Sequence, residues 1–198
     1  EALQQNAALS QADLLADLDA MGVDGGANVR TNWLANAIVL DATPDQIAAL
    51  EQREDVRVVE LNETIQLDPY IQTVTPGKLA TGDDEVSTWG LKATKALEAR
   101  QTYAVDGTGV LVGILDTGYD NNHPLLNGKV ASWKSFISDD QTDPMDDNGH
   151  GSHCAGTIGG SSGGAMEIGM APGGKFVVGN IPSGSGGGSR EGVMSGMA

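Results

Sequence analysis

The stretch GTGVLVGILDTG, residues 107–118, is an apolar run of strand length bounded by glycines. Such a run is typical of a strand that is buried on both faces of a parallel sheet. KFVVGNI at 175–181 is a second run of this kind, LKATKALEARQTYA at 91–104 indicates a short helix, and SREGVMSGMA at 189–198 begins like a helix with Ser189 as its N-cap. Strands, glycine-rich loops and helices in alternation predict an α/β fold for this part of the chain.

The first 68 residues indicate a separate small domain. A helix capped by Ser10 and ending at Gly22 is followed by a hairpin at 28–42, a helix from Thr43 and a strand at 55–67. With one more strand in front, this order would be β-α-β-β-α-β, the ferredoxin-like split βαβ arrangement. We therefore expect a small α+β ferredoxin-like domain that lacks its first strand, in a chain that has lost its N-terminus.

Two local patterns in this domain predict the roles of single residues. Thr43 is followed by Pro44 and, three residues after Thr43, by Gln46, which predicts a capping box at the start of a helix. Ala35 and Asn36 form the expected turn of the hairpin.

Residues 69–88 differ from both neighbouring regions. They lack periodicity and contain two prolines and two glycines, which indicates an exposed linker that is easily cut. The predicted division is therefore a small domain at 1–68, a linker with a processing site at 69–88, and an α/β region at 89–198.

The composition excludes several classes of function. The 198 residues carry 27 acidic and 11 basic side chains, a net charge of −16. This argues against binding to nucleic acid, because phosphates are bound by lysine and arginine. No apolar run approaches the length of about 20 residues that spans a bilayer, so no membrane partner is expected. Cys154 is the only cysteine, which excludes a disulfide within the chain.

Two short stretches hold the residues that could do chemistry. Asp116 ends the apolar run at 107–118, and the carboxyl ends of parallel strands are where α/β folds place their sites. An aspartate before Thr-Gly also commonly caps only its own turn. DDNGHGSHCAG at 146–156 contains Cys154 and two of the three histidines, His150 and His153. Glycines on both sides of His150 allow a tight backbone turn there.

Three interpretations of these residues stay open on this evidence. His150 and His153 could bind a metal ion with a nearby aspartate, although the pattern lacks the glutamate of HExxH. Cys154 could be a nucleophile, although acidic surroundings raise the pKa of a thiol. Asp116 could orient His150 as the general base of an acyl-transfer site whose nucleophile is a serine.

GVLVGILDTGYDNNHP followed by DDNGHGSHCAGTIGG resembles the first two signature blocks of the subtilisin-like serine proteases (subtilases, S8 family). The blocks agree over many consecutive residues, in the right order and at a fitting separation. The resemblance implies the N-terminal half of a subtilisin-like parallel-sheet domain, in which Asp116 and His150 belong to an Asp-His-Ser triad. It also implies that Cys154 packs behind the histidine and that His123 and His153 are structural.

Further segments extend this resemblance. GMAPGGKFVVGNI at 169–181 is similar to the family's segment in which G-x-A-P is followed by a strand. The family's glycine-rich edge, which pairs with the extended substrate, is matched most closely by Gly186, Gly187 and Gly188. Residues 1–68 resemble the I9-type propeptides that inhibit subtilases and assist their folding. Bacillopeptidase F-like and halophilic subtilases are the branches that the sequence resembles most.

The nucleophile block of the family, G-T-S-M-A-x-P, is absent from these residues, and so is the N-G segment that supplies an oxyanion-hole donor. Ser195 lies too soon after the glycine-rich edge, in a segment that is helical in the family, to be the nucleophile. We therefore expect a chain truncated before the catalytic serine, inactive by itself, from a full-length protein that is a serine endopeptidase.

The resemblance also implies partners and location. It implies polypeptide substrates, a propeptide bound to its own catalytic domain, and a secreted protein. We expect no required cofactor, with calcium as the candidate structural ion in an acidic loop made of Asp139, Asp140, Asp143, Asp146 and Asp147. Two alternatives remain: a non-catalytic pseudo-protease or propeptide-type protease inhibitor, and a zinc-binding protein that uses His150 and His153.

Overall fold

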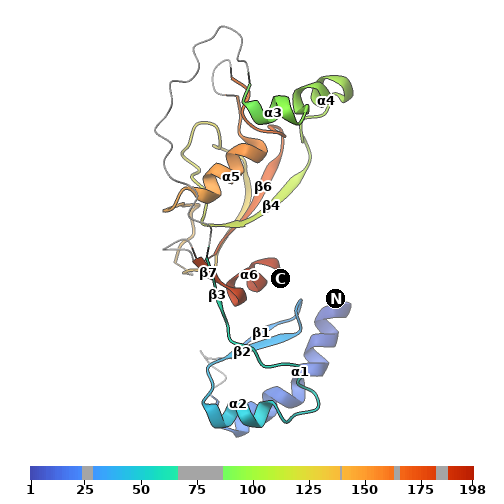
Figure 1. The fold of residues 1–198 in the computed structure, drawn as a ribbon, viewed down its shortest axis with the longest axis vertical. Helices are drawn as coiled ribbons and strands as arrows, with labels where there is room; N and C mark the ends of the chain where they lie inside the picture. Colours follow the sequence, from blue (N-terminus) through green and yellow to red (C-terminus); the bar gives the residue numbers. More distant parts are fainter. Residues whose placement is uncertain (24–28, 67–86, 139, 163–165, 182–186) are drawn as a thin grey trace. The chain divides into compact units, whose positions relative to one another are not determined.

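The computed structural model describes residues 1–23, 29–66, 87–138, 140–162, 166–181 and 187–198 (Figure 1). The chain forms two compact units, the first made of residues 1–65 and 189–198 and the second of residues 66–188. The predicted linker at 69–88 therefore lies outside the described residues, except for Ser87 and Thr88. Among the residues that the structure describes, no helix has the length and apolar character needed to cross a bilayer.

The first unit contains three helices and a hairpin. Its elements are α1 (Ala2–Ala20), β1 (Val29–Asn32), β2 (Ala37–Leu40), α2 (Pro44–Leu50) and α6 (Arg190–Met197). Strands β1 and β2 pair antiparallel, and Asn36 in the turn between them has a φ of 48°, a backbone conformation that asparagine tolerates better than most residues. The predicted hairpin and its turn are thus confirmed.

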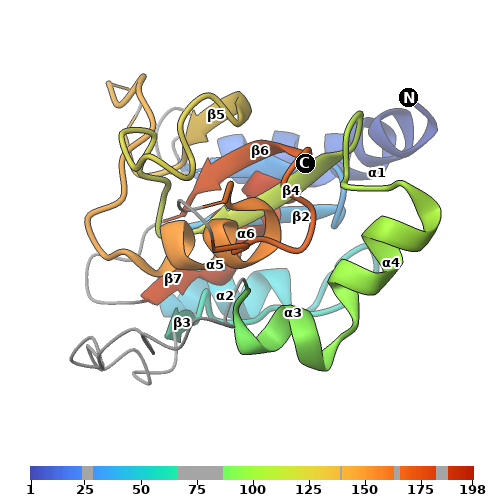
Figure 2. The same ribbon diagram turned by 90° about the horizontal axis from the view of Figure 1, so that it is seen from above.

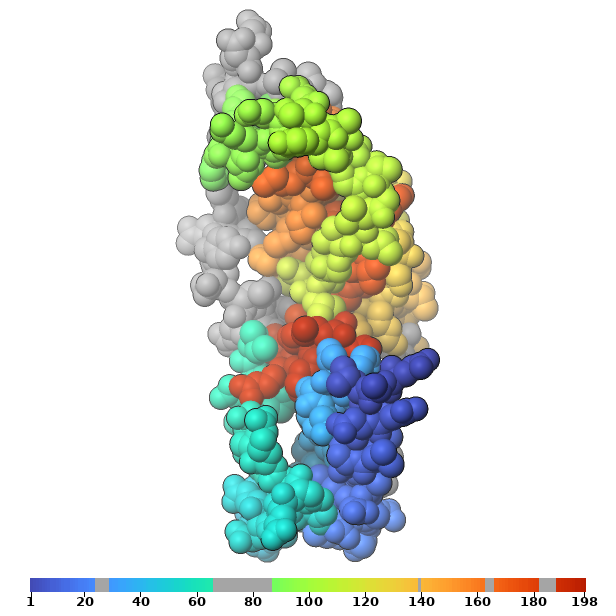
Figure 3. Space-filling view, turned by 90° about the vertical axis from the view of Figure 1, so that its right-hand side faces the viewer, coloured from blue at the N-terminus to red at the C-terminus, as the bar shows by residue number. Residues whose placement is uncertain are grey.

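Apolar side chains of α1, the hairpin and α2 form the core of this unit. Leu18, Val23 and Leu50 are buried, and partly buried side chains from the hairpin pack against them. Gln11 of α1 donates a hydrogen bond of 2.9 Å to the Asn36 side chain in the hairpin turn. Figure 3 shows the atoms of α1 lying against those of the hairpin.

The two predicted helix starts in this unit have different outcomes. At α2, Thr43 and Gln46 form the predicted capping box, with Gln46 Oε1 2.8 Å from the Thr43 backbone nitrogen. At α1, the prediction is wrong, because the helix begins at Ala2 and Ser10 lies inside it. Residues 2–9 are almost all good helix formers, so the helix continues past the predicted cap toward the N-terminus. The Ser10 hydroxyl instead donates to the Ala7 carbonyl oxygen.

The expected strand at 55–67 forms only at its end. Residues 55–63 form no strand, and β3 (Thr64–Gln66) pairs with β7 (Gly187–Ser189) rather than with the hairpin. In a split βαβ sheet, the last strand pairs with the strand that precedes the first helix. Among the described residues no strand precedes α1, and residues 55–63 pair with none, although Val59 still packs against the core.

The second unit is built on a parallel sheet. Its elements are α3 (Trp89–Ala93), α4 (Ala96–Tyr103), β4 (Leu111–Asp116), β5 (Val130–Ser135), α5 (His150–Gly159) and β6 (Lys175–Asn180). Strand β6 lies between β4 and β5 and pairs with both in parallel. Figures 1 and 2 show α5 lying along one face of this sheet, where it contacts β4. An α/β fold is therefore confirmed for this unit.

The core of the second unit fills the space between the sheet and α5. Phe176 and Val178 of β6 and Ala155 of α5 are buried together, with Ile114 of β4. The ring centroids of Phe176 and Tyr119 lie 5.7 Å apart. Gly151, Ala155 and Gly159 are the buried residues of α5, and this stripe of small side chains lets the helix approach the sheet closely.

Two predictions for this unit need correction. The expected helix at 91–104 is two helices, because Lys95 adopts a left-handed conformation with a φ of 59° and ends the first. Among the described residues α5 covers one face of β4, and on the other face Leu111 keeps 62% of its surface exposed. Strand β4 is an edge strand of the three-stranded sheet, and α5 covers a single face.

Candidate active site

Asp116 is the last residue of β4, at the carboxyl end of the parallel sheet. Its register partner on β6 is Asn180, and the Thr117 backbone N–H donates a 2.7 Å hydrogen bond to Asp116 Oδ1. The side chain keeps 12% of its surface exposed. The carboxylate therefore lies at the edge of the sheet where it can meet a residue from a following loop or helix.

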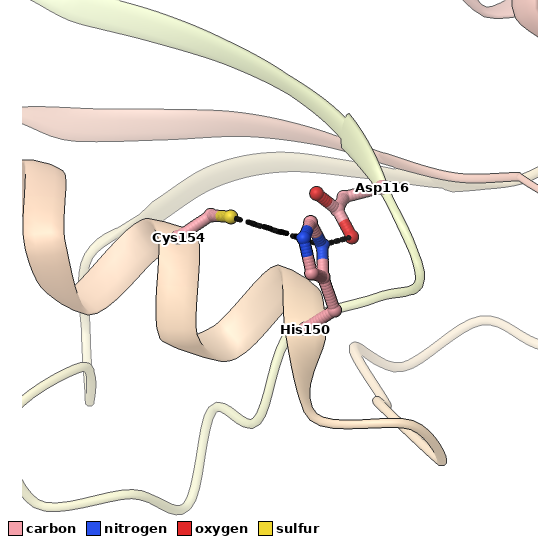
Figure 4. A group of neighbouring side chains, drawn as sticks. All are labelled: Asp116, His150 and Cys154. Atoms are coloured by element: carbon pink, nitrogen blue, oxygen red, sulfur yellow. Dashed lines mark hydrogen bonds and ion pairs between the residues drawn. The ribbon is translucent and has the colours of Figure 1, made fainter. Parts of the chain in front are cut away.

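His150 is the first residue of α5 and meets Asp116 there. Its Nδ1 lies 2.6 Å from Asp116 Oδ1, and each of the two side chains is 12% exposed. Figure 4 shows the imidazole pointing from the first turn of the helix toward the end of β4. Since a carboxylate only accepts hydrogen bonds, Nδ1 carries the proton in this contact. The structure thus brings together the two residues that the sequence singled out as an Asp–His pair.

Two glycines allow the backbone segments of these residues to approach each other. A Cβ atom on Gly118 would lie 2.0 Å from the Met145 carbonyl oxygen, and one on Gly151 would lie 2.2 Å from the Gly118 carbonyl oxygen. Gly118 also has a φ of 137°, which side-chain-bearing residues rarely adopt. The glycines that follow Asp116 and His150 therefore permit their contact.

Cys154 lies one helical turn after His150. Its sulfur is 3.7 Å from His150 Nδ1 and 3.9 Å from Nε2. Burial and the negative charge of Asp116 raise the pKa of the Cys154 thiol above its ordinary value. A thiol that resists ionisation is a poor nucleophile, so the site does not favour the interpretation of Cys154 as the reactive group.

The ligand atoms of Asp116, His150 and Cys154 lie within 4.8 Å of one another, which raises the question of a metal ion. A zinc ion bonded to both Nδ1 and a carboxylate oxygen would hold these two atoms about 3.3 Å apart. The observed 2.6 Å is the distance of a hydrogen bond. The donor set therefore fits a metal ion only if Asp116 and His150 move apart.

His153 does not join this group. In the described part of the chain, no cluster of three metal-ligating side chains includes His153. It lines a separate cavity of about 600 Å³, together with Thr88, Trp89, His123, Leu126 and Gly156. The alternative of a zinc site built on both His150 and His153 thus has no support from this arrangement.

The remaining predicted site residues are placed as follows. Gly187 and Gly188 belong to β7, whereas Gly186 lies outside the described residues, as does Asp139 of the acidic loop. Among the residues that the structure describes, the other aspartates of that loop do not gather into a group of three that could hold an ion. Substrate binding by these glycines and calcium binding by the loop stay predictions.

One residue of the site was missed by the sequence analysis. Asp146, assigned there only to the acidic loop, accepts hydrogen bonds from Thr117, next to Asp116, and from Gly149, next to His150. The signal that could have found it is the glycine at the N-cap of α5. Gly149 has no side chain with which to cap the helix, so an acidic residue shortly before it is a candidate for that role.

The second unit and α6 lie largely within a segment that matches a known family. Residues 107–198 match the family model described as "Subtilase family". This segment includes β4, β5, β6 and α5, with both Asp116 and His150.

Curated relatives match a larger share of the chain. It is 32% identical over 166 residues to "Alkaline serine exoprotease A" of Vibrio alginolyticus, an alignment that covers 82% of this chain and 29% of the relative. It is 36% identical over 137 residues to "Subtilisin-like protease 6" of Trichophyton equinum, covering 67% of this chain and 31% of the relative. The chain thus spans about a third of the length of the curated relatives that it matches.

A solved structure also aligns with part of the chain. It is described as "Crystal structure of a cold adapted subtilisin-like serine proteinase" and is 42% identical, with a TM-score of 0.41. The alignment covers 46% of this chain and 32% of the solved chain.

Proposed function

We propose that this chain, a homologue of the subtilisin-like serine proteases of the subtilase family, carries the Asp-His half of the catalytic triad of a serine endopeptidase. Asp116 and His150 are the two triad members, and a serine outside residues 1–198 is the third. The substrates are polypeptides. The observation that carries this proposal is the 2.6 Å contact between His150 Nδ1 and Asp116 Oδ1, inside the segment that matches the family.

The geometry of the pair supports these roles. Asp116 accepts the Nδ1–H of His150, which fixes the tautomer that leaves Nε2 as the basic nitrogen. His150 would take the proton of the serine hydroxyl through Nε2 and later give it to the leaving amine. Asp116 stays ionised and stabilises the imidazolium that exists between these two proton transfers. The low exposure of both side chains limits the screening of this interaction by water.

Residues 1–68 are proposed to be an I9-type propeptide, followed by a linker at 69–88 that contains the processing site and by the catalytic region at 89–198. The alignment with the Vibrio alginolyticus relative covers 82% of the chain, more than residues 69–198 could supply, so it extends into the first 68 residues. This supports a shared N-terminal region rather than an unrelated addition.

Contacts within the first unit support binding of this region to the family-matching segment. Arg190, in the first turn of α6, forms ion pairs with Glu60 at 2.5 Å and with Glu63 at 3.3 Å. Asn62 Oδ1 accepts a 3.2 Å hydrogen bond from the Glu191 backbone N–H. Residues 60–63 therefore neutralise Arg190 and satisfy an N–H group at the start of α6, a group that has no partner within the helix.

Residues 1–198 contain no G-T-S-M-A-x-P segment, and we propose that this piece alone does not hydrolyse peptides. We do not assign the nucleophile to Ser195, whose hydroxyl donates to the Glu191 carboxylate within α6 at 3.0 Å. We also propose that the whole protein is secreted, belongs to the bacillopeptidase F-like or halophilic branch, and needs no cofactor apart from structural calcium.

Labelling with a fluorophosphonate probe tests this function. The reading frame that contains codons 1–198 is expressed in full, beside the 198-residue piece. We expect the probe to label the full product, to leave the piece unlabelled, and to fail with His150→Ala in the full product. Labelling of the piece, or equal labelling of the His150→Ala product, would contradict the assignment.

The alternative is a non-catalytic inhibitor, and the contacts of residues 60–63 with α6 are the observation that favours it. A reading frame that stops after codon 198 without a nucleophile block would support it. In that case, the purified chain is expected to slow peptide hydrolysis by an active subtilisin, and Arg190→Ala, which breaks both ion pairs, serves as the comparison variant.

A further inference from the structure

Asp146 lies four residues before His150, in the loop that leads into α5. Its backbone forms an isolated antiparallel bridge with Gly118, and the Tyr119 N–H donates a 3.1 Å hydrogen bond to the Met145 carbonyl oxygen. The loop before α5 is therefore held against the loop that follows Asp116.

The Asp146 carboxylate accepts hydrogen bonds from both of these loops and from the helix. Oδ1 accepts from Thr117 Oγ1 at 2.8 Å and from the backbone N–H of Gly149 at 2.8 Å. It also accepts from the backbone N–H of Asn148 at 3.2 Å. Oδ2 accepts from Ser152 twice, from the backbone N–H at 2.8 Å and from the hydroxyl at 2.6 Å. Every one of these partners is a donor, so the site requires a group that only accepts.

The electrostatics of the site favour the ionised form of Asp146. Burial raises the pKa of its carboxyl, but the hydrogen bonds from Ser152, Gly149 and Thr117 together outweigh burial and lower the pKa below its ordinary value. The carboxylate also lies beside the first turn of α5, where negative charge is stabilised by the unpaired N–H groups of the helix.

The bonds of Asp146 lead to the neighbours of both proposed catalytic residues. Thr117 follows Asp116, and its Oγ1 also accepts a 2.9 Å hydrogen bond from the backbone N–H of Gly151, which follows His150. Ser152 Oγ accepts in turn from the Asp120 backbone N–H at 2.9 Å. The backbones that carry Asp116 and His150 are thus joined through one carboxylate and two hydroxyl groups.

We propose that Asp146 is a positioning residue that holds His150 in hydrogen-bonding contact with Asp116 by fixing the start of α5 to the loop after β4. This proposal rests on the proposed function only for its effect on catalysis. The geometric effect belongs to residues 1–198 and can be measured in them directly.

The substitution Asp146→Asn separates the need for an acceptor from the need for volume. An asparagine has the same shape but presents an NH₂ group in place of one oxygen. If the NH₂ group takes the place of Oδ2, it faces the donors of Ser152. If it takes the place of Oδ1, it faces the donors of Gly149 and Thr117. Glu98→Gln is the control, because it removes the same charge from an exposed side chain of the second unit that lies outside the acidic loop.

Proton NMR of the 198-residue chain detects the hydrogen bond between His150 and Asp116 directly. A short Nδ1–H···carboxylate hydrogen bond gives a low-field proton resonance, and Asp116→Asn in the same chain assigns it. We expect this resonance in the wild-type chain and in Glu98→Gln, and its loss in Asp146→Asn while circular dichroism shows that the variant is folded. In the full reading-frame product, we expect Asp146→Asn to lower kcat about 100-fold without raising KM, as a displaced catalytic group does.

If Asp146→Asn does not fold, Thr117→Val and Ser152→Ala each remove one hydroxyl from the network, and each should weaken the resonance and speed its exchange with water. Thr117→Ser keeps the hydroxyl and should restore it. A folded Asp146→Asn chain with an unchanged resonance would overturn the proposal, as would a wild-type chain that shows none. Loss of the resonance together with a full product that does not hydrolyse peptides would support positioning and refute the proposed function.

Discussion

The two faces of the three-stranded sheet differ in what surrounds their side chains. On the face toward α5, Phe176 is fully buried and Val178 keeps 1% of its surface exposed. On the other face, Leu111 and Val177 keep 62% and 40% exposed. The proposed active site lies on the covered side, where His150 enters from α5. The Asp–His pair therefore lies on the face of the sheet that α5 packs against.

Two contributions on the covered face determine how His150 is placed beside Asp116. The apolar core brings α5 to the sheet, and the polar network around Asp146 then sets the position of its first turn. The open face has neither of these, so the same change of side chain should have very different consequences on the two faces.

The largest expected contrast is between Phe176→Ala and Val177→Ala, adjacent residues of β6 that point to opposite faces. Removing the buried ring should lower the free energy of unfolding by about 3–5 kcal/mol, because it leaves a cavity next to Tyr119 and α5. Removing the exposed methyl groups should cost no more than about 0.5 kcal/mol. Urea denaturation of the 198-residue chain measures the free energy of unfolding of both variants. Similar losses for the two variants would contradict a core on one face only.

A second contrast compares two glycines on either side of Asp116. Gly118→Ala should lower the free energy of unfolding by about 1–3 kcal/mol from its backbone conformation alone, in addition to the clash of a Cβ 2.0 Å from the Met145 oxygen. Gly113→Ala is the control, since a Cβ there meets nothing within 4 Å. It should be neutral, or stabilising by up to about 1 kcal/mol. Thermal unfolding of the two variants measures this difference. Equal midpoints would contradict the close approach of the Met145 carbonyl oxygen to Gly118.

Tyr119 offers a smaller test on the covered face, through pH. Its hydroxyl donates a 2.7 Å hydrogen bond to the Leu126 carbonyl oxygen, and burial raises its pKa from 10.0 to about 12. Since the folded state favours the protonated phenol, this contribution to stability is complete below pH 10.0 and is lost as the pH rises toward about 12.

Tyr119→Phe should therefore cost about 1 kcal/mol at neutral pH, from the lost hydrogen bond. It should also remove the part of the alkaline decline that belongs to this phenol. Unfolding curves measured from pH 8 upward give the comparison. A wild-type chain and a Tyr119→Phe chain with the same alkaline decline would show that Tyr119 is not buried as described.

The smallest expected effect is a decrease in the rate at which the Cys154 thiol is alkylated. Because burial and Asp116 raise the pKa of this thiol, alkylation by iodoacetamide at pH 8 should be slower than for an exposed cysteine. Asp116→Asn should accelerate it, and the urea-unfolded chain should react like a free thiol. Rapid alkylation of the folded chain would contradict the proposed environment of Cys154.

The sequence predicted the elements that depend on local signals. The apolar runs at β4 and β6, the capping box of α2 and the Ser189 cap of α6 involve neighbouring residues only, and the structure confirms them. The Asp116–His150 contact was predicted through a family resemblance, since 34 residues separate the two.

The failures involve partners that are distant in sequence. Strand β5 was not predicted, because VASWKS lacks a clear alternation and is held by pairing with β6. Residues 55–63 have strand-like composition, but no strand of the described residues pairs with them. Asp146 was missed because its partner Thr117 lies 29 residues before it and comes close only in the folded chain.

The proposed role of His150, paired with Asp116, is that of the general base of a serine endopeptidase. The most direct measurement is kcat/KM for a chromogenic peptide with the full reading-frame product, beside the same product carrying His150→Ala and a control carrying His153→Ala. We expect a loss of about 10⁴-fold or more for His150→Ala and little change for His153→Ala. A His150→Ala product within about tenfold of wild type, a difference of only 1.4 kcal/mol in barrier height, would contradict the claim.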